Sequence, residues 1–209
     1  MNNHQLCYHR DSNVILSIRD MGALDLYQIK LLHFPSIRTA RRRMEVLTEK
    51  KKVNRVRPSI EKPYHYFVGK QPAQLDHRIG TNYARMYLRK QLKSWEVEHS
   101  WEYEPQYYMP MLRPDGFLAV KNTVANKLSC YFIEFDRAFD PFDKVQKYNE
   151  LYTTAKYKDA WWLDAVDRFP IIVVVSENVE RAQKALKDNK ANLEFRFLDY
   201  EHVRRSTQC

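Results

Sequence analysis

Three acidic residues in the middle of the chain have the types and spacing of a cation-binding or catalytic site. Asp115 follows a proline just before the apolar segment 117–120. Glu134 and Asp136 lie two residues apart at the end of the next apolar segment. Because alternate residues of a strand point to the same face, Glu134 and Asp136 are predicted to share one side of a sheet. If the two strands are neighbours, the three carboxylates converge and require a cation or a proton to offset their repulsion.

Magnesium is the cation that such a cluster would select. Mg²⁺ prefers a few carboxylate ligands plus water molecules, as in sites that cleave phosphodiester bonds. We therefore take Asp115 and Glu134 as candidate metal ligands, with the upstream Glu98 or Glu104 as a further ligand. The alternative interpretation is that these acids are solvated strand ends or partners in salt bridges.

A phosphodiester-cleaving site also needs a positive charge, which orients the attacking water and offsets the charge of the transition state. Asp136 supplies the opposite charge, so a lysine has to come from another element. Lys144 and Lys147 on the following segment are the nearest candidates. The candidate catalytic set is Asp115, Glu134, Asp136 and Lys147.

The elements that position these residues follow from the hydrophobic pattern of residues 73–209. Five consecutive β-branched residues, 171–175, are typical of a strand buried on both faces. Helices are predicted over 75–92, 143–157 and from a cap at Ser176 or Asn178 through 186, and strands over 95–103, 117–120, 128–135, 171–175 and 193–198. Strands that alternate with helices favour a mixed sheet with helices on both sides. The fold class is therefore α/β, or α+β for the chain as a whole.

The first third of the chain holds nearly all of its excess positive charge. Residues 1–72 contain 14 Lys and Arg against 6 Asp and Glu, a net charge of +8 out of +9 for all 209 residues. Such a concentrated basic region is typical of nucleic-acid binding. We therefore predict a DNA-binding domain over 1–72 and a second domain over 73–209.

Three helices followed by two short strands are predicted in this basic region. The first helix ends near Gly22, and the second covers 24–32. The third begins after Ser36, a good N-cap, and its apolar residues at 37, 40, 44 and 47 form one stripe. Alternating segments at 53–57 and 64–68 then flank a basic loop. This order predicts a winged helix-turn-helix, with a helical bundle as the alternative.

The residues expected to contact DNA lie on the third helix and in the predicted wing. A recognition helix presents its N-terminal residues to the major groove, where arginine bonds guanine edges or phosphates. The candidates are Arg38, Thr39, Arg41 and Arg42 on the helix, and Lys51, Lys52, Arg55, Arg57 and Lys62 after it. Because a dimer matches the symmetry of DNA half-sites, we expect a homodimer on double-stranded DNA.

Two motif patterns resemble known families. Pro114-Asp115, followed 19 residues later by Glu134, resembles the Pro-Asp…Glu-x-Lys signature of restriction-endonuclease-like nucleases. A wider pattern over about 35–190 resembles the plasmid and phage replication-relaxation family. It consists of Arg41-Arg42-Arg43-Met44, Val53 to Pro58, Pro63-Tyr64-His65-Tyr66, Arg113 to Gly116, Phe132 to Arg137, Lys144, Lys147, Tyr148 and Pro170 to Ser176. The resemblance implies a winged helix-turn-helix joined to a restriction-endonuclease-like domain.

Together these observations predict a DNA-binding protein of a mobile element. We expect a role in replication, in relaxosome assembly or in its regulation, with replication or relaxosome proteins as partners. The nuclease-like domain is expected to be degenerate because Asp136 stands where the signature has lysine; the alternative is a Mg²⁺-dependent endonuclease. The long apolar run of a membrane helix and a secretory signal are not found, and the three cysteines are far apart. We therefore expect a cytoplasmic protein.

Overall fold

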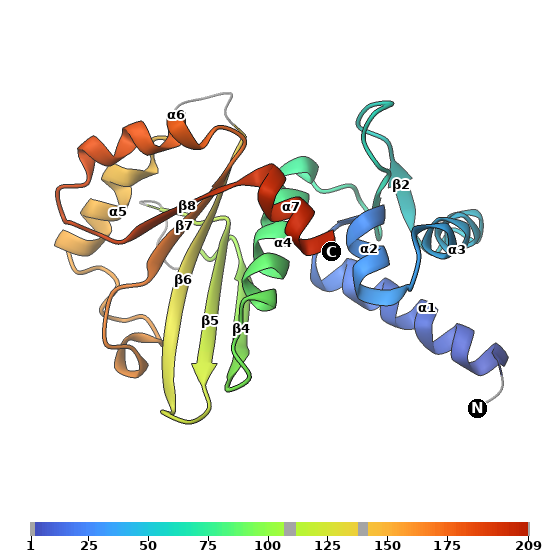
Figure 1. Cartoon of the computed structure of the whole chain (residues 1–209), viewed down its shortest axis with the longest axis horizontal. Helices are drawn as coiled ribbons and strands as arrows, with labels where there is room; N and C mark the ends of the chain where they lie inside the picture. Colours follow the sequence, from blue (N-terminus) through green and yellow to red (C-terminus); the bar gives the residue numbers. More distant parts are fainter. Residues whose placement is uncertain (1–2, 107–111, 138–141, 209) are drawn as a thin grey trace. The chain divides into compact units, whose positions relative to one another are not determined.

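A computed structural model describes residues 3–106, 112–137 and 142–208. The chain divides into two compact units. The N-terminal unit runs to Tyr83 and includes the residues from Thr207 onward, and the second unit is Ala84–Ser206 (Figure 1). Both units combine helices with a β-sheet, which confirms the expected mixture of α and β structure. The division falls inside a helix, whereas the sequence placed it before that helix, at 72.

The N-terminal unit has a three-stranded antiparallel sheet in the order β1-β3-β2. Its elements are α1 (Asn3–Asp20), β1 (Leu24–Asp25), α2 (Leu26–His33), α3 (Ile37–Glu49), β2 (Asn54–Val56), β3 (His65–Phe67) and the first half of α4 (Leu75–Lys90). The helices and the two later strands agree with the sequence prediction to within a few residues, except that β1 was assigned to a helix.

A capping box explains why α2 begins later than predicted. The Asp25 side chain accepts a hydrogen bond from the Gln28 backbone N at 2.7 Å, and Gln28 Oε1 accepts one from the Asp25 backbone N at 3.0 Å. These reciprocal bonds satisfy two backbone donors at the helix start. Leu24 and Asp25 thus stay extended and pair with Tyr66 and His65 of β3.

Helix α3 has the cap and the buried stripe that its sequence predicts. The Ser36 hydroxyl accepts a hydrogen bond from the Thr39 backbone N at 3.2 Å. Ala40, Met44 and Leu47 are buried, so one face of the helix contributes to the core of the unit. The charged residues Arg38, Arg41 and Arg42 of this helix are exposed.

The first half of α4 belongs to the N-terminal unit because its side chains and backbone bond to the region around β1. Tyr83 donates from its hydroxyl to Asp25 Oδ2 at 2.7 Å. Asn82 Nδ2 donates to the backbone carbonyl of Met21 at 3.1 Å. Gln28 Nε2 donates to the carbonyl of Ile79 at 3.0 Å. These buried polar groups are satisfied only with this part of α4 in place.

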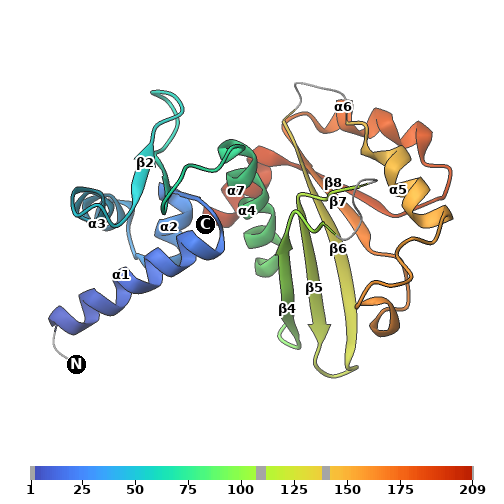
Figure 2. The same ribbon diagram turned by 180° about the vertical axis from the view of Figure 1, so that it is seen from behind.

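The second unit is built on a five-stranded mixed sheet in the order β4-β5-β6-β7-β8. Its strands are β4 (Glu96–Tyr103), β5 (Gly116–Asn122), β6 (Lys127–Asp136), β7 (Ile171–Ser176) and β8 (Phe195–Asp199), and its helices are α5 (Lys144–Thr153), α6 (Val179–Gln183) and α7 (Tyr200–Gln208), with 3₁₀ helices η1 (Leu163–Ala165) and η2 (Lys184–Asp188). The first three strands are antiparallel, and β6, β7 and β8 are parallel. Helices α5 and α6 lie on one side of the sheet, and α4 and α7 on the other (Figures 1 and 2).

The turn between β5 and β6 determines how these two strands are aligned. Asn122 Oδ1 accepts hydrogen bonds from the backbone N atoms of Val124 and Ala125, at 3.0 and 2.9 Å. The hairpin then pairs Asn122 with Lys127 at this end and Gly116 with Ile133 at the other. The length of this turn therefore sets the register of the two strands as far as the Gly116–Ile133 pair.

Aromatic rings fill the core between the sheet and α5. Phe132 on β6 packs against Phe117 on β5 and Tyr148 on α5, with ring centroids 5.5 and 5.4 Å apart. Trp162 is fully buried in the same core. Cys130 is also buried, and burial raises the pKa of its thiol to about 12, which disfavours the reactive thiolate.

Candidate functional site

The antiparallel pairing of β5 and β6 brings Asp115 and Glu134 together. Gly116 pairs with Ile133, and the Asp115 backbone N donates to the Ile133 carbonyl at 3.0 Å. One residue further, Asp115 and Glu134 stand opposite each other, and opposed residues of antiparallel strands project to the same face. Asp115 is 9% exposed and Glu134 only 1%. The structure therefore supports the expected approach of these two carboxylates.

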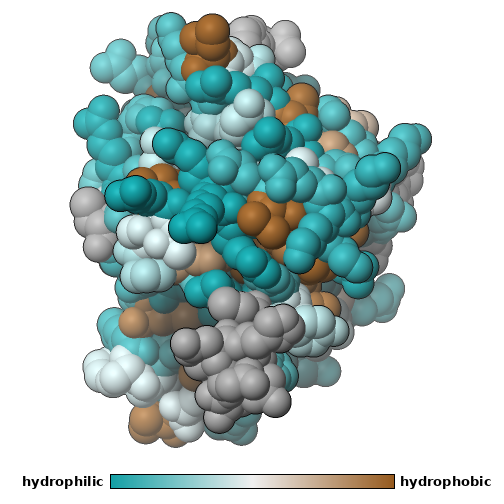
Figure 3. Space-filling view, turned by 90° about the vertical axis from the view of Figure 1, so that its right-hand side faces the viewer, coloured by the Kyte–Doolittle hydropathy of each residue, from teal (hydrophilic) through white to brown (hydrophobic). Residues whose placement is uncertain are grey.

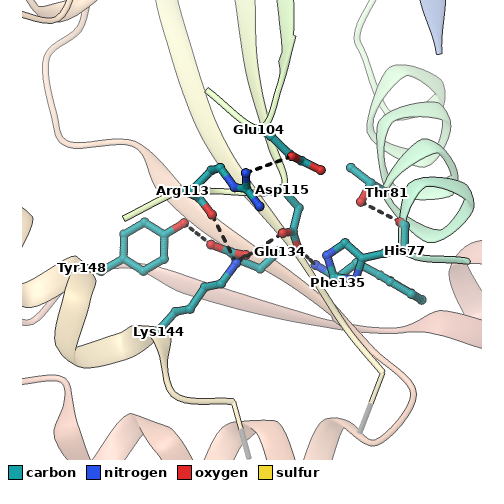
Figure 4. Close-up of polar contacts among 9 residues, drawn as sticks. All are labelled: His77, Thr81, Glu104, Arg113, Asp115, Glu134, Phe135, Lys144 and Tyr148. Atoms are coloured by element: carbon teal, nitrogen blue, oxygen red, sulfur yellow. Dashed lines mark hydrogen bonds and ion pairs between the residues drawn. The ribbon is translucent and has the colours of Figure 1, made fainter. Parts of the chain in front are cut away.

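Lys144, the first residue of α5, supplies the positive charge of the site (Figure 4). Its Nζ lies 3.2 Å from Asp115 Oδ1 and hydrogen-bonds Glu134 Oε2. The Arg113 carbonyl also accepts from this amine, at 3.4 Å. One ammonium group thus bridges two buried carboxylates.

The other oxygen of each carboxylate is held by the protein itself. Asp115 Oδ2 accepts from the Phe135 backbone N at 2.7 Å, and Glu134 Oε1 accepts from the Tyr148 hydroxyl at 2.6 Å (Figure 4). Each acid therefore has one oxygen fixed in orientation and one directed at Lys144. In the sequence, Tyr148 was noted as part of the family resemblance, without a role in the site. Its position four residues after Lys144, on the same helix face, was the signal for this contact.

The buried cluster changes the protonation of its members. Burial raises the pKa of Glu134 to about 8, although the neighbouring Lys144 acts in the opposite direction. Burial also opposes the charge on Lys144, but Glu134 and Asp115 outweigh it and raise the pKa of the amine. Burial thus favours a proton on Glu134, whereas its contact with Lys144 favours the charged form. The Tyr148 hydroxyl can donate or accept, so it satisfies either form of Glu134.

Lys147 was the wrong choice for the lysine of this site. Asp143 is the N-cap of α5, so the helix begins at Lys144 beside the ends of β5 and β6. Three residues later the helix has turned by about 300°. Lys147 is exposed and lines a groove between α5 and the α6–η2 segment.

Asp136 makes a different contact from the one expected. It lies at the end of β6, and its Oδ2 accepts a hydrogen bond from the Ser176 hydroxyl on β7 at 2.7 Å. Lys144 instead contacts Asp115, Glu134 and the Arg113 carbonyl. The structure thus brings together two of the three acids around the amine.

The two upstream acids proposed as additional ligands are in ion pairs. Glu98 on β4 accepts from Arg85, with Arg85 Nη2 2.7 Å from Glu98 Oε1. Glu104 lies 3.5 Å from the Arg113 guanidinium. Glu98 therefore pairs with α4, whereas Glu104 lies at the edge of the cluster through its contact with Arg113 (Figure 4).

The donor set around Lys144 fits a hard divalent cation in part. Asp115 Oδ1, Glu134 Oε2 and the Arg113 carbonyl are all oxygens, which Mg²⁺ prefers. Among the residues that the structure describes, no group of three or more His, Cys, Asp and Glu side chains is placed to hold a metal. A metal would therefore rely on these two carboxylates and on water, and it would compete with the Lys144 ammonium and the Glu134 proton.

The nine residues expected to contact DNA are all exposed. They are Arg38, Thr39, Arg41 and Arg42 on α3, Lys51 and Lys52 in the turn that follows, and Arg55, Arg57 and Lys62 in and around the β2–β3 hairpin. Arg43, by contrast, pairs with Asp11 of α1. Figure 3 shows that the face of the molecule on the side of α1 and α3 in Figure 1 is mainly hydrophilic.

Three cations of the hairpin also make contacts within the protein. Arg57 donates to the backbone carbonyls of Lys62, at 3.2 Å, and Ile60. The Arg55 guanidinium lies over the Tyr64 ring, 4.5 Å from its centroid. Lys62 Nζ is 3.6 Å from Asp76 Oδ2. Arg57 therefore maintains the loop, whereas Arg38, Arg41 and Arg42 make no such contact within the part of the chain that the structure describes.

Within the described part of the chain, no helix is long and apolar enough to cross a membrane. No protein-family model matches the chain, and comparisons with curated proteins and with solved structures gave no match.

Proposed function

We propose that this protein binds duplex DNA through its N-terminal unit. The observation that supports the proposal most directly is the exposure of all nine candidate residues on α3, the turn after it and the β2–β3 hairpin. Helix, basic turn and hairpin follow one another in the order of a winged helix-turn-helix. In such a domain, Arg38 and Arg42 would approach base edges while Lys51, Lys52 and Lys62 would meet phosphates.

The second unit is proposed to be a nuclease-like domain that does not cut DNA at neutral pH. An acid directly before β5, an acid on β6 and a lysine on α5 support this proposal, although the nuclease signature has its lysine at the position of Asp136. The Lys144 ammonium bonds the same Asp115 and Glu134 oxygens that a divalent cation would use, and the raised pKa of Glu134 also disfavours such a cation. Metal binding would require displacement of the Lys144 amine and a deprotonated Glu134.

A second candidate function is a Mg²⁺-dependent endonuclease. The position of Lys144 favours this function, because its amine supplies the positive charge that the signature obtains from a lysine at the position of Asp136. Asp115, Glu134 and the Arg113 carbonyl would hold the metal, which would stabilise negative charge on a phosphate. In this case Lys144 orients the attacking water, and Tyr148 holds Glu134 in place.

The biological setting follows from the resemblance to the replication-relaxation family. We propose a role for this protein in replication of a mobile element or in relaxosome assembly or its regulation, together with replication or relaxosome proteins. A homodimer is the proposed form on DNA, because two half-sites multiply the affinity.

Two measurements test the proposal. The first is the affinity of the full chain for duplex DNA by fluorescence anisotropy, in which Arg42→Ala should weaken binding and Arg19→Ala, which removes an exposed charge on α1, should not. Equal affinities of both variants and the wild type would refute DNA binding through α3.

The second measurement is nicking of supercoiled plasmid with Mg²⁺ or Mn²⁺ at pH 7 and pH 9. We expect no nicking at pH 7. Nicking at pH 7 that Asp115→Asn abolishes and Asp136→Asn preserves would instead establish the endonuclease.

A further inference from the structure

We propose that the second unit has a groove of its own for a nucleic-acid backbone, between α5 and the α6–η2 segment. The groove has a volume of about 530 Å³. Its lining is Phe142, Asp143, Val145, Gln146, Lys147, Arg181, Lys184, Ala185, Lys187 and Asp188. Four of these residues are cations and two are carboxylates, so the groove carries net positive charge. The inference rests on the proposed function only for its ligand class, DNA.

Three of the four cations form a row along one wall. Arg181, Lys184 and Lys187 follow one another at intervals of three residues, across α6 and the 3₁₀ helix η2. Lys184 and Lys187 are three residues apart within the 3₁₀ helix and therefore lie directly above one another. With a rise of about 1.5–2.0 Å per residue, the row spans roughly 9–12 Å. At about 3.4 Å of axis per charge on one strand, that length corresponds to roughly three phosphates.

The fourth cation, Lys147, comes from α5 on the opposite wall. Helices α5 and α6 lie on the same side of the sheet (Figure 1). Lys147 follows Lys144 by three residues, so the groove and the acid–lysine cluster both use side chains of α5.

The lysines of the groove differ in their pairing from other cations of this unit. Lys127 is paired with Asp167 at 2.7 Å, and Arg168 with Glu194 at 2.8 Å. Within the described ranges, Lys147, Lys184 and Lys187 form no ion pair, although Asp143 and Asp188 lie in the same lining. Binding of phosphates there breaks no existing ion pair of these lysines. Cations arranged in a row fit a chain of phosphates better than a single small anion, which needs donors that converge on one point.

The test uses the full-length protein and a charge-matched control. Lys184→Glu/Lys187→Glu is compared with Lys156→Glu/Lys158→Glu, a pair of exposed lysines after α5 outside this lining. Affinity for labelled duplex and single-stranded oligonucleotides is measured over a range of salt concentrations. We expect the groove pair to lower affinity at least tenfold, and to lower the salt slope for duplex by about 1.8, since each lost phosphate contact contributes about 0.9. Thermal unfolding of both variants checks that they fold.

The outcomes separate this inference from the proposed function. Equal losses for the two lysine pairs overturn the groove. Tight binding of inorganic phosphate that needs Lys184 and Lys187, without loss of oligonucleotide affinity, also overturns it in favour of a small-anion site. If Arg42→Ala has no effect while the groove pair weakens binding, the groove stands and DNA binding through α3 fails. If only Arg42→Ala weakens binding, the groove fails alone.

Discussion

Arg38 and Lys144 each lie in the first turn of a helix, where the positive end of the helix dipole disfavours a cation. The two units offset this cost differently. Lys144 is bridged to Asp115 and Glu134 within the protein, whereas Arg38 is exposed and has no ion pair among the described residues. A cation that pairs with carboxylates of the same unit, as Lys144 does, stabilises the fold. An exposed cation without an ion pair, such as Arg38, is available to an anion of a ligand. We therefore expect stability to depend on the paired Lys144 and its acids, and DNA affinity to depend on the exposed cations, with different responses to pH and salt.

The largest effect is expected from Lys144→Met, which leaves two buried acids without their cation. Removing one member of a buried pair costs about 3–5 kcal/mol of the free energy of unfolding, because the remaining charge is uncompensated. Lys147→Met, on the exposed side of the same helix, is the control and should change it by less than about 0.5 kcal/mol. Urea unfolding at pH 7 measures both values. Equal effects of the two variants would show that Lys144 is not a buried counterion.

A second effect concerns pH and Glu134. The folded state holds the Glu134 proton up to about pH 8, whereas an unperturbed carboxyl loses it near 4.5. Because the folded state binds more protons in this window, the contribution of Glu134 to stability falls as pH rises from about 4.5 to about 8. Glu134→Gln removes this slope, so its stability relative to the wild type should rise across the same window. A constant difference between the two proteins from pH 4.5 to 8 would contradict a proton on Glu134.

A smaller effect is expected at the exposed arginines. Arg38→Ala or Arg42→Ala should cost about 1–3 kcal/mol on a specific DNA site if the side chain bonds a base edge. The same change should cost less on random DNA, so the ratio of the two affinities falls. Competition binding at one salt concentration measures this ratio. Unfolding free energies should stay within about 0.5 kcal/mol of the wild type, since these residues are exposed.

The smallest effect is expected for phosphate contacts. Lys52→Ala and Lys62→Ala should each weaken binding to all DNA sequences alike and reduce the salt slope by about 0.9. The destabilisation by Lys144→Met, in contrast, should hardly change with salt, because buried charges are poorly screened. A salt-dependent penalty for Lys144→Met would remove the distinction between internal and external partners.

Much of the fold was predictable because its elements have strong local signals. The buried stripe of α3, its Ser36 cap and the β-branched strand β7 all lie where the sequence indicated. Strand β1 was missed because two residues give no periodicity, although Asp25 and Gln28 have the spacing of a capping box. Helix α7 was also missed, because its segment is mostly polar.

Of the candidate site, only the approach of the acids could be predicted, because it follows from the alternation of side chains along a strand. This alternation placed the acids on one face, and antiparallel pairing brought Asp115 opposite Glu134. The choice between Lys144 and Lys147 depends on the residue at which α5 begins, which the sequence does not determine to within one turn. The bond from Ser176 to Asp136 depends on which strand follows β6 in the sheet, a feature of tertiary structure.

The hairpin turn at Asn122 makes the site sensitive to insertions and deletions far from it. Six strand positions separate Asn122 from Gly116, or about 20 Å at 3.4 Å per residue. Loss of one residue from the turn would shift β6 by one position and send Glu134 to the opposite face of the sheet. Changes in the length of this exposed turn therefore act on the buried acids as directly as a substitution of Glu134, whereas most amino-acid replacements in the turn leave them in place.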